Sequence, residues 1–376
     1  MKKHQYKNIY FLRFIFILMI VFCHIFSGVP NPVFNFIATH HQGGGLAVEF
    51  FFILSGFFFA YTLDLNLSAF EYIKKRVLRL YPVLAFYVLG CFFCDILNVQ
   101  VAQGEEYGRI FQLLLLDGIG LNNGLDYGVS WFVSALLFSS LFLFCLYKSV
   151  SKKIADLLLG IIVLLSYVIL LNLGNIYDAH HIVWHNILPL SLVRAVSGMG
   201  LGIFLFYTYS HFNLNTAKQK PSILYGLLEI FLFGYCIYTM IYHNYYSEGL
   251  TIVLFWLLLY VFLMNKGFFS RLLENNFSVI LGRYSYSIYL THMFALTIIM
   301  VAYTTIDDGY FVLNYPLSAI FVLYLLVILL GILTYHFIEK PNNALYKKLG
   351  FYYYFAVFGG ILVLFTTAYI SYSLAR

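Results

Sequence analysis

The sequence predicts an all-α fold, a polytopic membrane helical bundle of about 10–11 transmembrane helices. Hydrophobic residues make up 62% of the 376 residues and charged residues only 10%, whereas a soluble domain carries about 25% charged residues. The apolar residues occur in runs of roughly 17–25, the length that crosses a bilayer as an α-helix. Tyrosines gather near the ends of these runs, as aromatic residues do at membrane interfaces.

The apolar runs define the elements in chain order. We expect eleven spans, at residues 9–28, 44–63, 80–98, 129–147, 155–173, 190–209, 222–242, 249–264, 279–303, 315–337 and 351–373. Residues 1–341, with ten of these spans, are assigned to one membrane domain, and residues 342–376 to an additional C-terminal transmembrane helix. The first run lacks a small-residue cleavage site, so we expect it to be retained as a span. The longest loop, at 99–128, is expected to contain a short interfacial or re-entrant piece.

Basic residues alternate between the loops. With the N-terminus in the cytoplasm, the cytoplasmic loops hold the basic clusters at 74–79, 148–153, 218–220, 266–271 and 340–348. The opposite loops hold acidic residues and a single basic residue, Arg109. This positive-inside pattern predicts a multi-pass protein of the cell inner (plasma) membrane with a cytoplasmic N-terminus. The net charge of +6 follows from this topology, so no nucleic-acid partner is expected.

Four ionisable residues are expected at one depth in the outer half of the membrane. They are His24 in the first span, Glu49 in the second, Arg194 in the sixth and His292 in the ninth. Buried charges are costly, so such residues pair or form a site. A structural interpretation pairs Glu49 with Arg194. A functional one lets the carboxylate hold the His24 tautomer, so that the other ring nitrogen accepts a proton from a hydroxyl. We favour the second and predict His24 and Glu49 as catalytic residues.

A second set of candidates lies toward the cytoplasm. Arg13 and His24 are eleven positions apart, which places both on one face of a helix, ~16 Å apart along its axis. Arg13 lies level with the stretch "EYIKKRVLRLYP", in which Arg76 and Arg79 share a helical face. These arginines suit lipid headgroups, and they equally suit the phosphates of a phosphorylated cofactor. The residues alone leave both interpretations open.

Three further features of the sequence bear on substrate binding, helix packing and metal binding. Trp131 opens the span at 129–147, as an interfacial belt residue or a substrate contact. In "GGGLAVEFFFILSGFFFAY", Gly56 shares a helical face with Glu49, and a small residue lets helices approach closely. Cys91 and Cys94 are three apart, but no His or Cys pair stands beside them at ligand spacing, so no metal is expected.

Taken in order, the motifs resemble those of the acyltransferase-3 family of integral membrane acyltransferases. Arg13 and His24 match its R-x10-H spacing. The stretch "GGGLAVEFFFILSGFF" is similar to the family segment G-x-x-x-V-[DE]-x-F-F-x-[LI]-S-G-F. Four further stretches resemble other motifs of the family and follow in the family's order: "KRVLRLYP", "SWFVSALL", "LGRYSYSIYLTH" and "YHFIEKP". The resemblance covers about residues 7–341, nearly the whole chain.

This resemblance implies the transfer of an acyl group, typically acetyl from cytoplasmic acetyl-CoA. The acceptor would be a hydroxyl of a surface polysaccharide, a lipid-linked glycan or a small sugar facing outward. Arg13, Arg76 and Arg79 would then hold the CoA phosphates, and the pantetheine arm would thread the bundle toward His24.

The family likeness also implies roles at the outer rim. His24 would act as general base on the acceptor hydroxyl or carry the acyl group itself, with Glu49 orienting it. Acceptor contacts are expected from Trp131, Arg194 and His292. The acceptor, the acyl chain length and the oligomeric state stay open. The alternative is a transporter or flippase for a glycolipid or acylated substrate, which would not consume acetyl-CoA.

Overall fold

The computed structural model describes residues 6–28, 42–97, 105–120, 128–174, 176–185, 187–212, 221–302 and 316–341. Within these residues the chain is mostly helical, and its strands form one antiparallel hairpin, β1 (Val183–Trp184) with β2 (Leu188–Pro189). Nine of the described helices are long and apolar enough to cross a membrane. The predicted all-α polytopic class is therefore confirmed. The expected span at 351–373, and with it the assignment of 342–376, lies outside the described residues.

The long helices alternate in direction across the bundle. In chain order they are α1 (Lys7–Gly28), α3 (Ala47–Thr62), α4 (Ala69–Leu97), α6 (Trp131–Ser149), α7 (Lys152–Asn172), α8 (Leu190–Phe212), α9 (Ile223–Ile241), α10 (Glu248–Met264), α13 (Ser285–Ala302) and α15 (Pro316–Thr334). The short ones are η1 (Gln42–Leu46), α5 (Glu105–Leu113), η2 (Asp117–Ile119), η3 (Ala179–His181), η5 (Tyr245–Ser247), α11 (Phe268–Leu272), α12 (Asn276–Arg283) and the π-helix η7 (Tyr335–Glu339). We call the side at which α1 begins the proximal side and the side at which it ends the distal side.

Two boundaries differ from the sequence-based expectation. Helix α4 begins at Ala69 and not at residue 80, because Ser68 and Glu71 form a capping box ahead of it. Its basic stretch is therefore helical. The expected span at 279–303 is divided at Tyr284 into α12 and α13. The predicted short piece in the loop 99–128 corresponds to α5 and η2.

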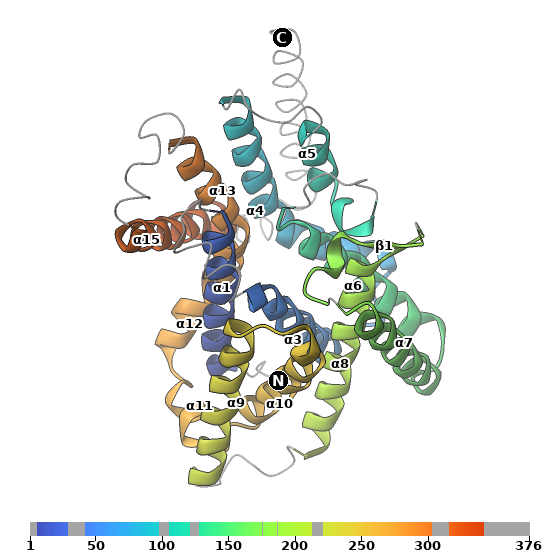
Figure 1. Ribbon diagram of the computed structural model, residues 1–376. Helices are drawn as coiled ribbons and strands as arrows, with labels where there is room; N and C mark the ends of the chain where they lie inside the picture. The colour runs from blue at the N-terminus through green and yellow to red at the C-terminus, as the bar shows by residue number, and fades with distance from the viewer. Residues whose placement is uncertain are drawn as a thin grey trace.

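Helix α1 runs through the middle of the bundle, beside η1, α3, α10, α12 and α13 (Figure 1). Its first turn is anchored by Glu274, whose carboxylate accepts hydrogen bonds from the backbone N–H groups of Lys7 and Asn8. The Asn8 amide donates to the Phe262 carbonyl at the end of α10. A carboxylate at a helix N-terminus pairs with otherwise unbonded N–H groups. These contacts set the height of α1 in the bundle.

Helices α3 and α8 approach each other to backbone contact. A Cβ atom on Gly56 would collide with the Met199 carbonyl oxygen, and one on Gly202 would collide with the Ile53 carbonyl oxygen. Small residues allow two membrane helices to approach to backbone contact. Because the backbones meet here, the side chains one or two turns away on both helices face each other directly.

The α3–α8 contact generates a stability prediction. Gly56→Ala places a methyl group against a backbone atom that cannot move aside, so we expect a loss of ~1–3 kcal/mol or more. Gly234 in α9 has open space around its would-be Cβ, so Gly234→Ala is expected to be neutral. Thermal unfolding of the two detergent-purified variants measures the difference. Equal midpoints would show that the α3–α8 contact is not tight.

Candidate active site

A cavity of about 240 Å³ lies at the distal side of α1. Its wall is built from α1, η1, α3, α6 and α13, together with the segment Ile176–His181 that precedes β1. His24 and Trp131 line it, as do His180 and Tyr289. The cavity is smaller than a typical pocket for a drug-sized ligand. It therefore has room for the reacting part of a substrate and not for a whole glycan.

His24 and His292 meet at this cavity. The Nε2 atom of His292 lies 3.3 Å from Nδ1 of His24. The Nδ1 atom of His24 is also 3.0 Å from the Ile20 carbonyl oxygen, and Nδ1 of His292 contacts the Tyr289 carbonyl oxygen. Carbonyl oxygens only accept hydrogen bonds, so each Nδ1 carries a proton in the neutral ring. The His292 Nε2 atom then accepts from His24, and the basic lone pair of His24 is on its own Nε2.

Glu49 and Arg194 form an ion pair in the core. Arg194 Nε donates to Glu49 Oε1 at 2.8 Å, and both side chains are fully buried. A second guanidinium nitrogen, Nη1, donates to the Tyr177 carbonyl oxygen at 3.1 Å. The guanidinium carbon lies 5.2 Å from the centre of the Trp131 ring. The structure thus brings Glu49 to Arg194 and His24 to His292, so the sequence-predicted residues form two linked pairs.

Trp131 and His180 form another part of the cavity wall. The two rings stack with centroids 4.3 Å apart and an interplanar angle of 18°. The Trp131 side chain is buried, so it is not a residue of the membrane-interface belt. Burial, followed by electrostatic interactions with the neighbouring His181, Arg194 and His24 side chains, holds the pKa of His180 well below its ordinary value. The His180 ring is therefore a neutral stacking partner at pH 7.

His180 also belongs to a group of metal-ligand residue types. Possible ligand atoms of Asp178, His180 and His181 lie within 4.8 Å of one another. Ligand atoms in a tetrahedral zinc site lie roughly 3.4 Å apart, so binding an ion would require these side chains to close in. Asp178 and His181 already contact each other, with Oδ1 and Nε2 3.4 Å apart.

A buried turn at Asp117 supports the Trp131 wall. The Ser130 hydroxyl donates to the Asp117 carboxylate, and the Gly118 carbonyl accepts from Ser191 at the start of α8. Burial raises the pKa of Asp117 to about 7. Tyr289 donates to the Val129 carbonyl oxygen at 2.8 Å and ties α13 to the start of α6. Trp131 is thereby held by α8 and α13 as well as by its own helix.

The proximal arginines do not all gather at one point. Arg13 interacts electrostatically with Arg79 and with Glu339, at the end of the π-helix η7. Glu339 also accepts a hydrogen bond of 2.6 Å from Ser287. Arg76 instead packs over the Tyr72 ring, which stacks on Phe144 of α6. The structure therefore groups Arg13 and Arg79 around the Glu339 carboxylate. Arg76 is not part of this group, because it packs on Tyr72.

Comparison with known proteins bears on this arrangement. A family model described as an acyltransferase domain, Acyl_transf_3, matches residues 6–337. The chain belongs to the acyltransferase-3 family. Neither the curated proteins nor the solved structures include a match to it. The protein is accordingly a multi-pass membrane acyltransferase, and both polar regions lie within the matched residues except for Glu339, two residues past their end.

In this acyltransferase the helix face between Arg13 and His24 is packed. Ile17 and Ile20 stand between them at helical spacing and are 3% and 1% exposed. The described cavity extends down α1 to Ile20. A substrate arm that reaches His24 from the proximal side has to displace these side chains.

Several residues of the acyltransferase site were missed in the sequence. Tyr177, Asp178 and His180 lie outside the apolar runs, so depth along a span did not place them. Glu339 was noted only as part of the motif "YHFIEKP". Its position between basic residues becomes visible once η7 is seen to end beside α1 and α13. The adjacent histidines in "DAHH" were the one local signal for the loop.

The buried ion pair generates a second prediction. Glu49→Leu alone leaves the Arg194 charge buried and unpaired, so we expect it to cost ~3–5 kcal/mol of stability. The double variant Glu49→Leu with Arg194→Met removes both charges and fills the space. We expect it to recover to within ~1–2 kcal/mol of the wild type. Thermal unfolding in one detergent compares the three proteins, and an undisturbed single variant would contradict the pairing.

Proposed function

We propose that this acyltransferase moves an acetyl or short acyl group from acyl-CoA to a sugar hydroxyl of a cell-surface or lipid-linked glycan. The observation that carries the proposal is the hydrogen bond between His24, which lines the distal cavity, and the fully buried His292. It supplies a proton acceptor of defined tautomer at a site with room for a reacting hydroxyl and thioester.

The chemistry follows from the tautomer. The Nε2 lone pair of His24 takes the proton of the acceptor hydroxyl while the hydroxyl oxygen attacks the thioester carbonyl. The new C–O bond forms, the C–S bond breaks, and the CoA thiolate leaves and takes up the proton. During the step the His24 ring is cationic, and its Nδ1–H points at the Ile20 carbonyl and at His292 Nε2. His292 therefore does for His24 what a carboxylate does in a catalytic triad.

The same geometry accommodates a covalent relay. His24 Nε2 then attacks the thioester carbonyl first, the C–S bond breaks and CoA leaves as the thiolate, so that the acyl group rests on the ring. In a second step the acceptor hydroxyl attacks this acyl group, the C–N bond breaks, and the hydroxyl proton passes to the freed Nε2 and from there to the thiolate. A relay gives ping-pong kinetics, whereas direct transfer needs both substrates bound together. In either route His292 holds the ring of His24 in place.

Glu49 takes a positioning role in this proposal. Its carboxylate holds Arg194, and Arg194 in turn holds the Tyr177 carbonyl and lies over Trp131. We infer that Trp131, Arg194 and His180 shape the acceptor side of the cavity. In this proposal Trp131 and Arg194 influence acceptor binding by shaping the cavity wall.

The donor side is proposed to be the proximal cluster. Arg13 and Arg79 suit the CoA phosphates because a guanidinium presents a fork of donors to phosphate oxygens. Glu339 keeps the two arginines together in the absence of phosphate. Arg76, on the adjoining face of α4, extends the basic surface. The basic proximal loops support a cytoplasmic proximal side in the inner membrane, so the donor enters from the cytoplasm.

The histidine pair gives the main test. Membranes are incubated with labelled acetyl-CoA and a glycan acceptor, and transfer is measured. We expect His24→Ala to abolish transfer and His292→Gln to lower kcat by ~10²–10⁴-fold, the range for a lost base or its support. His211→Ala, at an exposed histidine near the end of α8, is the matched control and should keep full activity.

Full activity of His24→Ala would remove this residue from the mechanism. A wild-type protein that changes the glycolipid distribution across vesicles without consuming acetyl-CoA would favour the transporter or flippase instead. Mass analysis of the acceptor, with an increment of one acetyl group per transfer, identifies the group moved.

The donor cluster gives a separate prediction. Arg79→Lys keeps the charge but loses the two-pronged geometry, so we expect the KM for acyl-CoA to rise about tenfold with little change in kcat. Lys153→Ala, at an exposed basic residue on the same side, is the control. Initial rates at varied acyl-CoA concentration measure both. An unchanged KM in Arg79→Lys and Arg79→Ala would exclude Arg79 from donor binding.

A further inference from the structure

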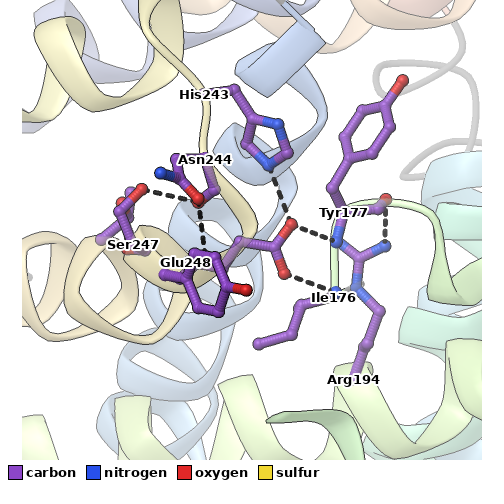
Figure 2. Close-up of polar contacts among 9 residues, drawn as sticks. Ile176, Tyr177, Arg194, His243, Asn244, Ser247 and Glu248 are labelled. Atoms are coloured by element: carbon purple, nitrogen blue, oxygen red, sulfur yellow. Dashed lines mark hydrogen bonds and ion pairs between the residues drawn. The ribbon is translucent and has the colours of Figure 1, made fainter. Parts of the chain in front are cut away.

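A buried carboxylate that does not contact His24 or His292 in any hydrogen bond described above holds the segment Ile176–His181 in place. Glu248, in the first turn of α10, is 1% exposed. Its two oxygens accept hydrogen bonds from the backbone N–H of Ile176 at 2.6 Å and of Tyr177 at 3.4 Å (Figure 2). His243 Nε2 donates to the same carboxylate at 2.8 Å. Glu248 thus binds the segment through backbone and not through any particular side chain.

Tyr177 is held from the other side as well. Its carbonyl oxygen accepts from Arg194 Nη1, and in Figure 2 Arg194 and Glu248 approach this residue from different helices. The Tyr177 ring lies directly against Gly45 of η1, where any Cβ would collide with it. One residue is therefore fixed by α8, by α10 and by η1 at once.

This segment delivers polar side chains to the cavity. Asp178, His180 and His181 all follow Tyr177 and line the cavity that contains His24. Asp178 and His181 are about half exposed, at 46% and 44%, whereas His180 is stacked against Trp131. A carboxylate and an imidazole at the entrance can accept and donate hydrogen bonds to neighbouring sugar hydroxyls.

We propose that Glu248 is a positioning residue that fixes the Ile176–His181 segment as the acceptor-recognition wall, on which Asp178 and His181 bind hydroxyl groups of the acceptor sugar. This inference rests on the proposed function for the identity of the acceptor. The holding of the segment by Glu248 stands on the hydrogen bonds alone. Neither part requires Glu248 to touch a substrate.

Glu229 provides a matched control. It is also a fully buried carboxylate, and it accepts from the backbone N–H groups of Gly267 and Ser270 and from the Ser270 hydroxyl. It lies in α9 at the proximal side, away from the cavity. Glu→Gln at either position replaces an accepting oxygen with an NH₂ group that faces an N–H donor. The general cost of the change is therefore similar at the two sites.

Cys23 reports the position of the segment without any catalysis. Its side chain lines the cavity and interacts with Tyr177. Cys236, in α9, is fully buried and reports global unfolding. The intact protein in detergent is treated with N-ethylmaleimide, and the labelled peptides of both cysteines are followed over time by mass spectrometry.

We expect Glu248→Gln to speed Cys23 labelling about tenfold or more, the effect of losing hydrogen bonds to a charged group. Cys236 labelling should not change, and Glu229→Gln should leave Cys23 labelling at the wild-type rate. In the transfer assay Glu248→Gln should raise the acceptor KM about tenfold while the acyl-CoA KM stays constant. Asp178→Asn should raise the acceptor KM without faster labelling.

An unchanged Cys23 rate in Glu248→Gln would overturn the positioning role. An unchanged acceptor KM in both Glu248→Gln and Asp178→Asn, with faster Cys23 labelling in Glu248→Gln, would overturn the recognition role and leave the proposed function intact. A wild-type protein that transfers no acyl group overturns the proposed function and the recognition role with it. The labelling rate still decides whether Glu248 holds the segment in that case.

Discussion

The buried ion pair between Glu49 and Arg194 is the interaction on which the rest of the site depends. Neither charge could be buried alone, because desolvation costs several kcal/mol and each partner offsets it only at contact distance. That distance exists because Gly56 and Gly202 let α3 and α8 approach to backbone contact. The absence of side chains at these two glycines thus permits the ion pair. The Nη1 atom of the guanidinium then donates to the Tyr177 carbonyl, in the segment that lines the cavity.

From Arg194 the support extends to the cavity wall in short steps. The guanidinium holds the Tyr177 carbonyl, Glu248 holds the N–H groups on the same stretch of backbone, and Trp131 stacks with His180 between them. The His24 imidazole lines the same cavity, and its tautomer is set by a carbonyl and by His292. The wall and the base come from different helices. Under the proposed function, the acceptor preference can therefore change in the loop while the chemistry at His24 stays the same.

The sequence predicted the membrane class, most helices and the level at which His24, Glu49, Arg194 and His292 lie, because hydrophobic length and rise per residue determine depth. It did not predict which of them are neighbours, because depth says nothing about the direction in which each helix faces. Glu49 was therefore assigned to His24, whereas the structure pairs it with Arg194. The loop residues Tyr177 and His180, and Glu248 at a helix start, carried no depth signal at all. The capping box at Ser68 and Glu71 was readable, and it would have placed the start of α4 correctly.

We propose that a donor bound by the proximal arginines delivers its thioester to the His24 imidazole at the distal cavity. The two lie ~16 Å apart along α1 with packed Ile17 and Ile20 between them. The most direct measurement is a structure of the protein with a non-hydrolysable acyl-CoA analogue. We expect its phosphates on Arg13 and Arg79, its arm past displaced Ile17 and Ile20, and its sulfur beside His24 Nε2. Phosphates bound elsewhere, or a sulfur that stays on the proximal side of an unmoved isoleucine pair, would contradict the claim.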